Sequence, residues 1–170
     1  MLVVLEEPSP EREADFISAV RRSRPFFAGF VNPPASSKAY GDYLDRCSMP
    51  DIEGRLVVLQ ESNEMAGVIN LNEIVLGSFR SGYLGYYSFS PHARRGYMRE
   101  GLSTMISWAF ADRSLHRLEA NIQPDNVASI ELVRGLGFRL EGFSPRYLKI
   151  GGDWRDHERW ALLADEWSQG

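Results

Sequence analysis

Arginines and a glycine gather where a long helix is predicted to begin, in the segment 91–102 (PHARRGYMREGL). The first N–H groups of a helix lack partners within it, and the positive end of the helix dipole favours anions there. Gly96 leaves the backbone open to a phosphate, and Arg94, Arg95 and Arg99 add positive charge. The segment predicts a pyrophosphate cradle, while an ordinary loop with its arginines in solvent remains the equally open alternative.

Two familiar phosphate-binding motifs are excluded for this segment. A P-loop requires Gly-Lys-Ser/Thr, which does not follow here. A dinucleotide-binding turn requires Gly-x-Gly-x-x-Gly, whereas only Gly96 and Gly101 are present.

A second polar group lies in the segment 124–142 (PDNVASIELVRGLGFRLEG). Asn126 stands at a predicted helix start, and Ser129 lies on the same side of the first turn. Asparagine is a good helix N-cap and a serine in the first turn is common. Taken alone, this segment therefore indicates only a well-formed helix.

The two segments together resemble the GNAT acetyltransferases. The similarity is greatest to the branch typified by the ribosomal-protein N-terminal alanine and serine acetyltransferases (the RimJ/RimL type), which reads GKGYM-x-E-A at a helix start and then N-x-x-S followed by GF-x-x-EG. It also covers the apolar loop Arg24–Pro34, the pair Gly85-Tyr86 and the segment Asp153–His157, and so extends over nearly the whole chain. The chain departs from the pattern at Ala93 and Arg94, so specific side-chain contacts of that loop are not carried over.

This resemblance implies an acyl-CoA-dependent N-acyltransferase with acetyl-CoA as co-substrate and no metal. In the family the acyl-CoA lies in a V-shaped opening between the fourth and fifth strands, where main-chain groups around Phe89 and Ser90 would hold the pantetheine arm and polarise the thioester carbonyl. Asn126 would contact the cofactor, and Ser129 would protonate the leaving thiolate. The pyrophosphate would bind the backbone amides of Arg94, Arg95, Gly96, Tyr97, Met98 and Arg99.

The expected reaction is direct transfer to an amine in a ternary complex. An ammonium with a pKa of about 8 (α-amino) or about 10.4 (lysine) must lose a proton before it attacks the thioester. The branch often uses a carboxylate acting through water, but no glutamate lies near Tyr147–Leu148, where one is expected. Glu73 and Glu119 remain as candidates for the base, and each also fits a carboxylate that is merely solvated or paired.

The histidines and the cysteine carry no motif of their own. His92 is expected to face solvent in its loop, and His157, beside Asp156, has no serine or cysteine nucleophile motif with it. Three scattered histidines and the single Cys47 predict no metal site. One cysteine also allows no intrachain disulfide, which fits a reducing, cytoplasmic compartment.

Apolar periodicity predicts the elements that position these residues. Strands are expected at 2–6, 55–60, 66–75, 83–90, 117–122, 139–149 and 155–164, and helices at 10–23, 36–46, 96–112 and 126–136. This order predicts an α/β (α+β) fold with a mixed sheet in a single domain spanning residues 1–170. The resemblance makes this a GNAT fold, with a mostly antiparallel sheet of about seven strands flanked by about four helices.

Composition sets broader limits. The 170 residues, of which 44% are hydrophobic, fit one domain with a sizeable core. The net charge of −4 argues against a nucleic-acid binder and fits a cationic substrate without identifying one. No stretch approaches the ~20 apolar residues of a membrane helix. The first residues lack a basic region and hold only a short apolar run, so we expect no signal peptide.

Several acceptors and one non-catalytic role stay open. The main hypothesis is a protein or peptide N-terminal α-amine, and the alternative is a small amine such as a polyamine, an aminoglycoside or an amino acid derivative. Acceptor contacts are expected from Phe26–Pro34 and Ile150–Trp154, where Asp153 is the only carboxylate, which favours peptides slightly over polycations. A non-catalytic acyl-CoA-binding sensor is the third alternative, and a homodimer fits the branch by analogy.

Overall fold

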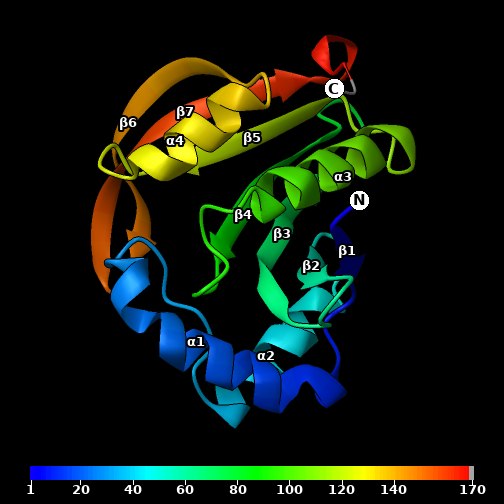
Figure 1. The fold of residues 1–170 in the computed structure, drawn as a ribbon. Coiled ribbons are helices and arrows are strands. Elements are labelled where there is room, and N and C mark those ends of the chain that lie inside the picture. The colour runs from blue at the N-terminus through cyan, green and yellow to red at the C-terminus, as the bar shows by residue number, and fades with distance from the viewer. Residues whose placement is uncertain (169–170) are drawn as a thin grey trace.

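The computed structural model describes residues 1–168, and its centre is one seven-stranded sheet in the order β1-β2-β3-β4-β5-β7-β6 (Figure 1). All neighbouring strands are antiparallel except β4 and β5, which are parallel. The strands are β1 (Val3–Glu6), β2 (Glu53–Leu59), β3 (Met65–Val75), β4 (Ser81–Ser88), β5 (Arg117–Ile122), β6 (Arg139–Ile150) and β7 (Asp153–Leu163).

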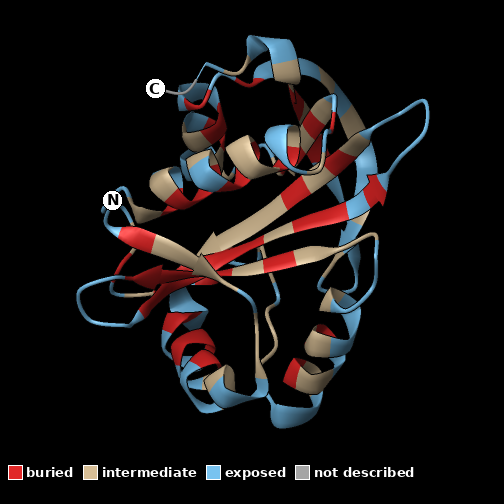
Figure 2. Cartoon of the chain, turned by 90° about the vertical axis from the view of Figure 1, so that its right-hand side faces the viewer, coloured by how far each residue is buried: buried red, intermediate tan, exposed pale blue. Residues whose placement is uncertain are grey.

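Two pairs of helices cover the two faces of the sheet. One apolar core joins α3 and α4 to the sheet, and a second core joins α1 and α2 to the opposite face of β2 and β3. Buried residues accordingly concentrate on the strands and on the sheet-facing sides of the helices (Figure 2). The α-helices are α1 (Glu13–Phe27), α2 (Ser37–Cys47), α3 (Tyr97–Ala111) and α4 (Val127–Gly135), and short 3-10 turns lie at Pro10–Arg12 and Ala164–Glu166.

The parallel pair β4–β5 is short. The two strands are in register only from Ser81 opposite Arg117 to Tyr83 opposite Glu119. Beyond Tyr83, β4 continues for several residues without β5 beside it. The sheet is therefore open between the far end of β4 and the far end of β5, with its two halves splayed as Figure 1 shows.

Helix α3 is held tightly against the sheet, which fixes the position of its N-terminus. Leu102, Met105 and Ile106 are fully or almost fully buried beneath it. A Cβ added at Gly101 would lie 3.1 Å from Val57, so the glycine permits this close approach. Packing of this density makes the helix start a rigid platform.

The predicted fold class is confirmed, as are the numbers of strands and helices, with one notable difference. The segment Arg24–Pro34 is not all loop, because α1 continues through Pro25 to Phe27 before Ala28 turns left-handed at φ 48°. A proline inside a helix costs about 3 kcal/mol. Burial of the Phe27 ring, edge-on to Tyr87, returns about 1.5–3 kcal/mol and stabilises that last turn.

Candidate functional site

The start of α3 presents unpaired backbone N–H groups. Gly96 is the N-cap residue at φ 85°, a left-handed conformation that glycine adopts without strain, and no side chain caps the helix. The first helical bond runs from the Glu100 N–H to the Gly96 carbonyl at 3.1 Å. The amides of Tyr97, Met98 and Arg99 therefore point out of the helix without an intrahelical acceptor.

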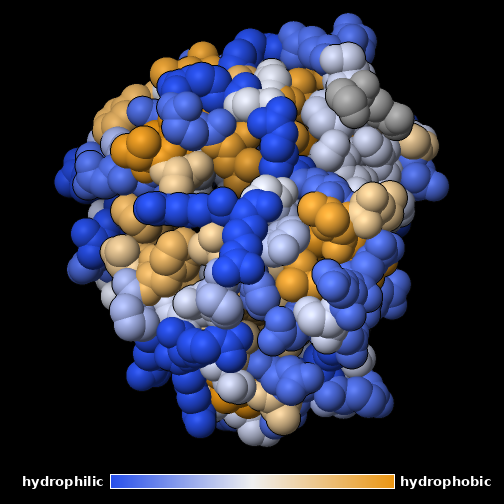
Figure 3. Space-filling view, in the orientation of Figure 1, coloured by the Kyte–Doolittle hydropathy of each residue, from blue (hydrophilic) through white to orange (hydrophobic). Residues whose placement is uncertain are grey.

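These amides line a cavity of about 550 Å³, called here the α3 cavity, between the starts of α3 and α4 and the end of α1. All six residues from Arg94 to Arg99 contribute to its lining. A Cβ built on Gly96 would meet nothing within 4 Å, so the backbone there faces open space. Strongly hydrophilic residues run through the middle of the face shown in Figure 3, between apolar patches. The arrangement suits an elongated ligand with an anionic end.

The arginines of the cradle have different roles. Arg94 and Arg95 are exposed, so their charges are free to approach an anion. Arg99 instead donates from Nη2 to the Gly135 carbonyl at 2.9 Å, at the C-terminus of α4. A cation at a helix C-terminus is favourable, and this bond ties α4 to α3. The backbone amide of Arg99 remains available while its side chain is structural.

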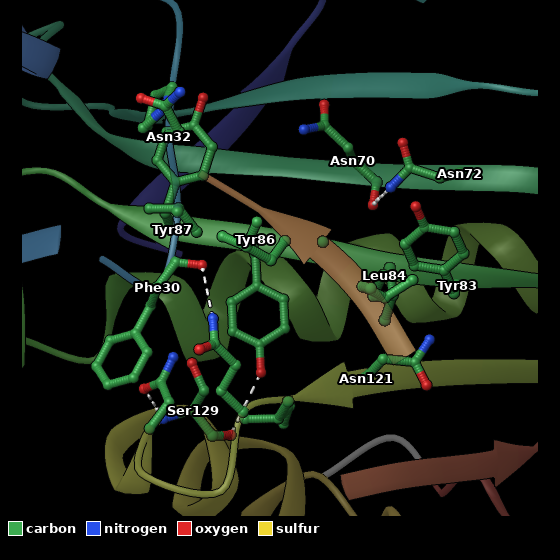
Figure 4. Close-up of a pocket in the computed structure, with 18 of the residues that line it drawn as sticks. Phe30, Asn32, Asn70, Asn72, Tyr83, Leu84, Tyr86, Tyr87, Asn121 and Ser129 are labelled. Atoms are coloured by element: carbon green, nitrogen blue, oxygen red, sulfur yellow. Dashed lines mark hydrogen bonds between the residues drawn. The ribbon is translucent and has the colours of Figure 1, made fainter. Parts of the chain in front are cut away.

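The start of α4 is capped, unlike that of α3. The Asn126 Oδ1 accepts a hydrogen bond from the Ser129 N–H at 3.3 Å. The Tyr86 hydroxyl donates to the Ser129 carbonyl at 3.3 Å, so β4 holds this turn from the other side (Figure 4). The Ser129 hydroxyl itself forms no hydrogen bond within residues 1–168, and Ser129 lines the α3 cavity.

The structure places Phe89 and Ser90 outside the lining of the α3 cavity. Strand β4 ends at Ser88, and the Phe89 ring is fully buried between α1 and the sheet. The Phe89 N–H donates to the Ala66 carbonyl at 2.8 Å, and the Ser90 N–H donates to the Ser23 hydroxyl at 2.9 Å. Both amides that the sequence assigned to an acyl-CoA thus have partners within the protein.

Tyr86 and Ser88 of β4, next to Phe89 and Ser90, present main-chain groups at the opening. Main-chain groups along a strand alternate in direction, and Phe89 points its N–H toward β3. Tyr86 and Ser88 therefore direct their N–H and C=O groups to the other side, where β5 has separated from β4. Both residues line the α3 cavity. Main-chain groups of β4 at the opening are therefore available from Tyr86 and Ser88.

His92 was expected in solvent and is buried instead, with 6% of its surface exposed. Its ring packs edge-on near Tyr97 and lines the α3 cavity. The Nε2 atom lies 3.4 Å from a carboxylate oxygen of Glu64. His92 lies in the turn after β4, where its N–H donates to the Phe89 carbonyl at 2.9 Å.

A second cavity of about 680 Å³, called here the sheet cavity, lies on the other side of the opening (Figure 4). Asn70 and Asn72 of β3 and Asn121 of β5 line it with amide groups. The Tyr43 hydroxyl donates to the Asn70 Oδ1 at 2.8 Å. A Cβ at Gly85 would meet only Asn72, at 3.4 Å, so this glycine keeps the floor of the cavity open.

Burial sets the protonation state of the tyrosines around the two cavities. Removal from water raises the pKa of Tyr43, Tyr83, Tyr86 and Tyr87 above the usual value of a phenol. These hydroxyls stay protonated at neutral pH, and those of Tyr43 and Tyr86 donate hydrogen bonds. They do not serve as bases.

The two glutamates considered as bases lie away from the opening. Glu119 is paired with Arg117 at 2.9 Å, and Glu73 is exposed on β3. Neither lines the α3 cavity or the sheet cavity. His157, which the sequence left without a role, lies in the wall of the sheet cavity with 3% of its surface exposed.

The two cavities meet at the open end of the sheet. Six residues line both of them, and they are Phe30, Val31, Tyr86, Tyr87, Asn126 and Ser129. Ser129 and Asn126 come from the start of α4, and the two tyrosines come from the unpaired end of β4. A group bound in one cavity can thus contact a group bound in the other beside Ser129.

Sequence reasoning missed the sheet cavity, although a signal for it was present. Asn70 and Asn72 are polar residues on one face of an otherwise apolar strand, and Asn121 repeats this pattern on β5. Polar residues at a spacing of two on strands buried on both faces indicate a cavity wall. Of the two segments expected to contact the acceptor, Phe26–Pro34 and Ile150–Trp154, residues 30–34 and Ile150 line the sheet cavity. Phe26 lines the α3 cavity instead, and Trp154 is exposed and lies outside both linings.

Within residues 1–168 no helix combines the length and hydrophobicity required to span a membrane. The same residues contain no group of three or more histidine, cysteine or acidic side chains placed to bind a metal ion.

Comparison with known proteins gives a consistent result. The family model of the acetyltransferase (GNAT) domain matches residues 3–139. The [ribosomal protein uS5]-alanine N-acetyltransferase of Escherichia coli (strain K12) is 38% identical over 110 residues, which is 65% of this chain and 57% of that enzyme. The match thus spans less than two thirds of the length of that relative.

Two solved structures share the whole fold. The ribosomal-protein-S5-alanine acetyltransferase from Vibrio fischeri superposes with a TM-score of 0.81 at 25% identity, covering 98% of this chain and 94% of that one. A spermidine N-acetyltransferase from Vibrio cholerae, in complex with CoA and spermine, gives a TM-score of 0.82 at 17% identity, covering 97% of each chain. The fold is therefore common to proteins named for different amine acceptors.

Proposed function

The chain belongs to the GNAT family of N-acetyltransferases, and from that premise we propose that it transfers the acetyl group of acetyl-CoA to the N-terminal α-amine of a protein or peptide. The observation that carries the proposal is the meeting of two cavities at Ser129. One cavity has an uncapped helix start suited to phosphates, and the other has a polar wall suited to an amine.

The α3 cavity fits the coenzyme. The free amides from Tyr97 to Arg99 and the open backbone at Gly96 would hold the pyrophosphate, with Arg94 and Arg95 adding charge. Tyr86 and Ser88 would bind the pantetheine arm through their main-chain groups at the opening. The bound coenzyme supplies an acyl thioester, which is already activated for attack by an amine.

Ser129 would act on the leaving group. Its hydroxyl is free of protein partners within residues 1–168, and its main chain is held by Asn126 and Tyr86. A positioned hydroxyl lowers the barrier by donating a proton to the sulfur as the thiolate leaves. A main-chain N–H of the opening would stabilise the charge that develops on the carbonyl oxygen.

The sheet cavity supports a singly charged acceptor. Among residues 1–168, Asp42 is the only carboxylate in the lining of this cavity, and its Oδ2 already accepts a bond from Lys38 Nζ at 2.7 Å. A polyamine with several cations would find little compensation there. The amides of Asn70, Asn72 and Asn121 instead offer groups that hydrogen-bond a peptide backbone.

The test is a thiol-release assay with acetyl-CoA and a panel of amines. The panel contains peptides that begin with alanine or serine, the same peptides blocked at the N-terminus but carrying a lysine, spermidine and an aminoglycoside. We expect release of the coenzyme thiol with the unblocked peptides and acetylation at their α-amines by mass spectrometry. Turnover with only spermidine or the aminoglycoside would contradict the proposal that the acceptor is a peptide. An absence of turnover with every amine would contradict the proposal that the protein is an active acetyltransferase.

A further inference from the structure

The orientation of His157 fixes which of its ring nitrogens carries a proton. Nδ1 lies 2.8 Å from the carbonyl oxygen of Arg155. A carbonyl oxygen only accepts hydrogen bonds, so Nδ1 must be the N–H in that contact. In the neutral ring the lone pair is therefore on Nε2.

Nε2 is the free end of the ring. It forms no hydrogen bond within residues 1–168, and it is not among the sealed polar atoms that lack a partner. His157 lines the sheet cavity, although its side chain is almost wholly buried. The lone pair on Nε2 is thus open to a molecule in that cavity and is otherwise protected from solvent.

The register of the sheet places His157 beside the opening. Glu158 of β7 lies opposite Ile122, the last residue of β5, so His157 is one residue beyond that pair. The chain leaves β5 at this level and enters the turn that carries Asn126 and Ser129. Arg159 lies opposite Asn121, and alternation along β7 puts His157 on the same face as this pair, toward the sheet cavity.

The other ionisable groups that face this cavity do not suit a base. Tyr43, Tyr83 and Tyr87 are kept protonated by burial, which raises the pKa of each phenol. Asp42 is paired with Lys38, and Arg46 is a cation.

The groups next to the imidazole are an aromatic ring of β6 and a hydrogen-bonded carboxylate of β7. The Tyr147 ring of β6 lies 6.2 Å from the His157 ring between centroids. The Asp156 carboxylate, on the same strand, accepts a bond from the Arg146 N–H at 2.7 Å. Among the described residues, His157 is thus the one imidazole in the cavity wall, and its basic lone pair is unengaged.

We propose that His157 is the general base that takes a proton from the amine acceptor, a role that rests on the function proposed above. One ammonium proton passes to Nε2 and then to solvent, which frees the nitrogen lone pair. The nitrogen–carbon bond forms and the carbon–sulfur bond breaks with its electron pair on sulfur. The coenzyme thiolate receives a proton from the Ser129 hydroxyl. A second proton leaves the nitrogen as the amide forms, and it reprotonates the Ser129 oxygen.

The first experiment compares His157→Gln with the wild-type enzyme across pH 6–9, using the best peptide acceptor. Glutamine retains a polar side chain but does not accept a proton. We expect kcat/KM to fall about 100-fold at neutral pH, the lower end of the usual range for a general base. The deficit should narrow to less than about tenfold at pH 9, because an α-amine with a pKa of about 8 is then mostly neutral without help.

The control is His116→Gln, since His116 is exposed and lines neither cavity. It should leave kcat/KM and its pH profile unchanged. A His157→Gln enzyme as active as wild type overturns the role of His157 alone, whereas a wild-type enzyme inactive on every amine overturns the proposed function. A loss of activity that is equal at every pH, with a lowered Tm, shows a structural role and also overturns the inference.

A second measurement needs no variant. In wild-type protein with 15N-labelled histidine, the ring nitrogens report the tautomer directly. We expect the neutral His157 ring to carry its proton on Nδ1, and addition of a peptide acceptor to perturb the Nε2 signal. A proton on Nε2 in the neutral ring would overturn the proposal, because no lone pair would then face the acceptor.

Discussion

The two cavities that meet at Ser129 are built from different parts of the polypeptide. The polar groups of the α3 cavity are main-chain amides from one continuous segment, 94–99, and from the unpaired end of β4. The polar groups of the sheet cavity are side chains from α2, β3, β4, β5 and β7. A backbone site depends on conformation and tolerates changes of side chain, whereas a side-chain site changes with each substitution. The first is suited to an invariant coenzyme, and the second is suited to selecting an acceptor.

The departures at Ala93 and Arg94 from the family pattern illustrate this difference. The conformation that the cradle needs is still present, because Arg94 at φ 62° and Gly96 at φ 85° bring the chain into α3. The amides after Gly96 remain uncapped. The changes of side chain therefore leave the backbone donors in place.

The largest effect is expected at the junction of the cavities. Ser129→Ala should lower kcat about 100-fold. This is the lower end of the range for a general acid, because a thiolate leaves with only modest help from a proton donor. The Kd for coenzyme A should stay unchanged, because the main chain of residue 129 and the Asn126 cap remain. Stopped-flow turnover and calorimetric titration measure the two quantities.

Ser103→Ala is the control for this substitution. Ser103 lies in the middle of α3 and lines neither cavity, so its loss should change neither kcat nor the Kd. An unchanged kcat in Ser129→Ala would show that the hydroxyl takes no part in the mechanism. The junction of the two cavities would then have no chemical role.

A smaller effect is expected when the sheet cavity alone is filled. Gly85→Leu should raise the KM for the acceptor about tenfold or more, because a buried isobutyl group would occupy the cavity floor beside Asn72. A tenfold change corresponds to a loss of about 1.4 kcal/mol of binding free energy. Coenzyme A should bind as before, since Gly85 is not in the lining of the α3 cavity. Gly85→Ala, whose methyl group makes an ordinary contact, should give an intermediate KM. An equal loss of coenzyme affinity would contradict the division between the cavities.

The reciprocal change fills the α3 cavity. Gly96→Ala should weaken coenzyme A binding about tenfold, because its methyl group would project into the space left for a phosphate and would strain a left-handed residue by about 1–2 kcal/mol. Gly77→Ala carries the same strain at φ 71° in an exposed turn that lines neither cavity. Both variants should lose similar thermal stability, and only Gly96→Ala should lose affinity. Equal affinities would contradict the cradle.

The same contrast explains which parts of the site are predictable from sequence. The α3 cradle is local, so helix periodicity together with Gly96 predicts where its free amides lie, although the same pattern left an ordinary loop equally open until the resemblance was added. The sheet cavity depends on the pairing of β3, β4, β5 and β7, and no local pattern gives the register that brings Asn72, Asn121 and His157 to one wall. The polar residues at a spacing of two on β3 indicate a cavity wall only when they are compared with the polar residues of the neighbouring strands.

Two differences from the sequence-based expectation, the end of β4 and the burial of His92, lie in the same turn. The resemblance assigns main-chain groups around Phe89 and Ser90 to the opening, whereas β4, expected to reach residue 90, ends at Ser88 and the Phe89 ring enters the core. His92 follows in the same turn and is buried with it. Tertiary packing of an aromatic side chain decided the strand end, and such packing is not visible in a single segment.

The smallest effect is expected at Asn126, where a helix cap and a coenzyme contact are superimposed. Asn126→Ala removes the acceptor for the Ser129 N–H and should lower the free energy of unfolding by about 1 kcal/mol. Asn126→Asp keeps an oxygen for that N–H and adds a negative charge near the helix start, so stability should be retained. Chemical denaturation measures both.

The coenzyme separates the two roles of Asn126. The place of Asn126 in the α3 cavity implies that its side chain borders the bound phosphates or pantetheine. The negative charge of Asn126→Asp should then weaken coenzyme A binding about fivefold. This corresponds to a repulsion of roughly 1 kcal/mol between two charges about 4 Å apart in water. Added salt should reduce that loss by screening the repulsion. An affinity equal to wild type at low salt would mean that Asn126 serves only to cap α4. The α3 cavity would then bind its ligand through the uncapped helix alone, which is the sharper form of the contrast between a backbone site and a side-chain site.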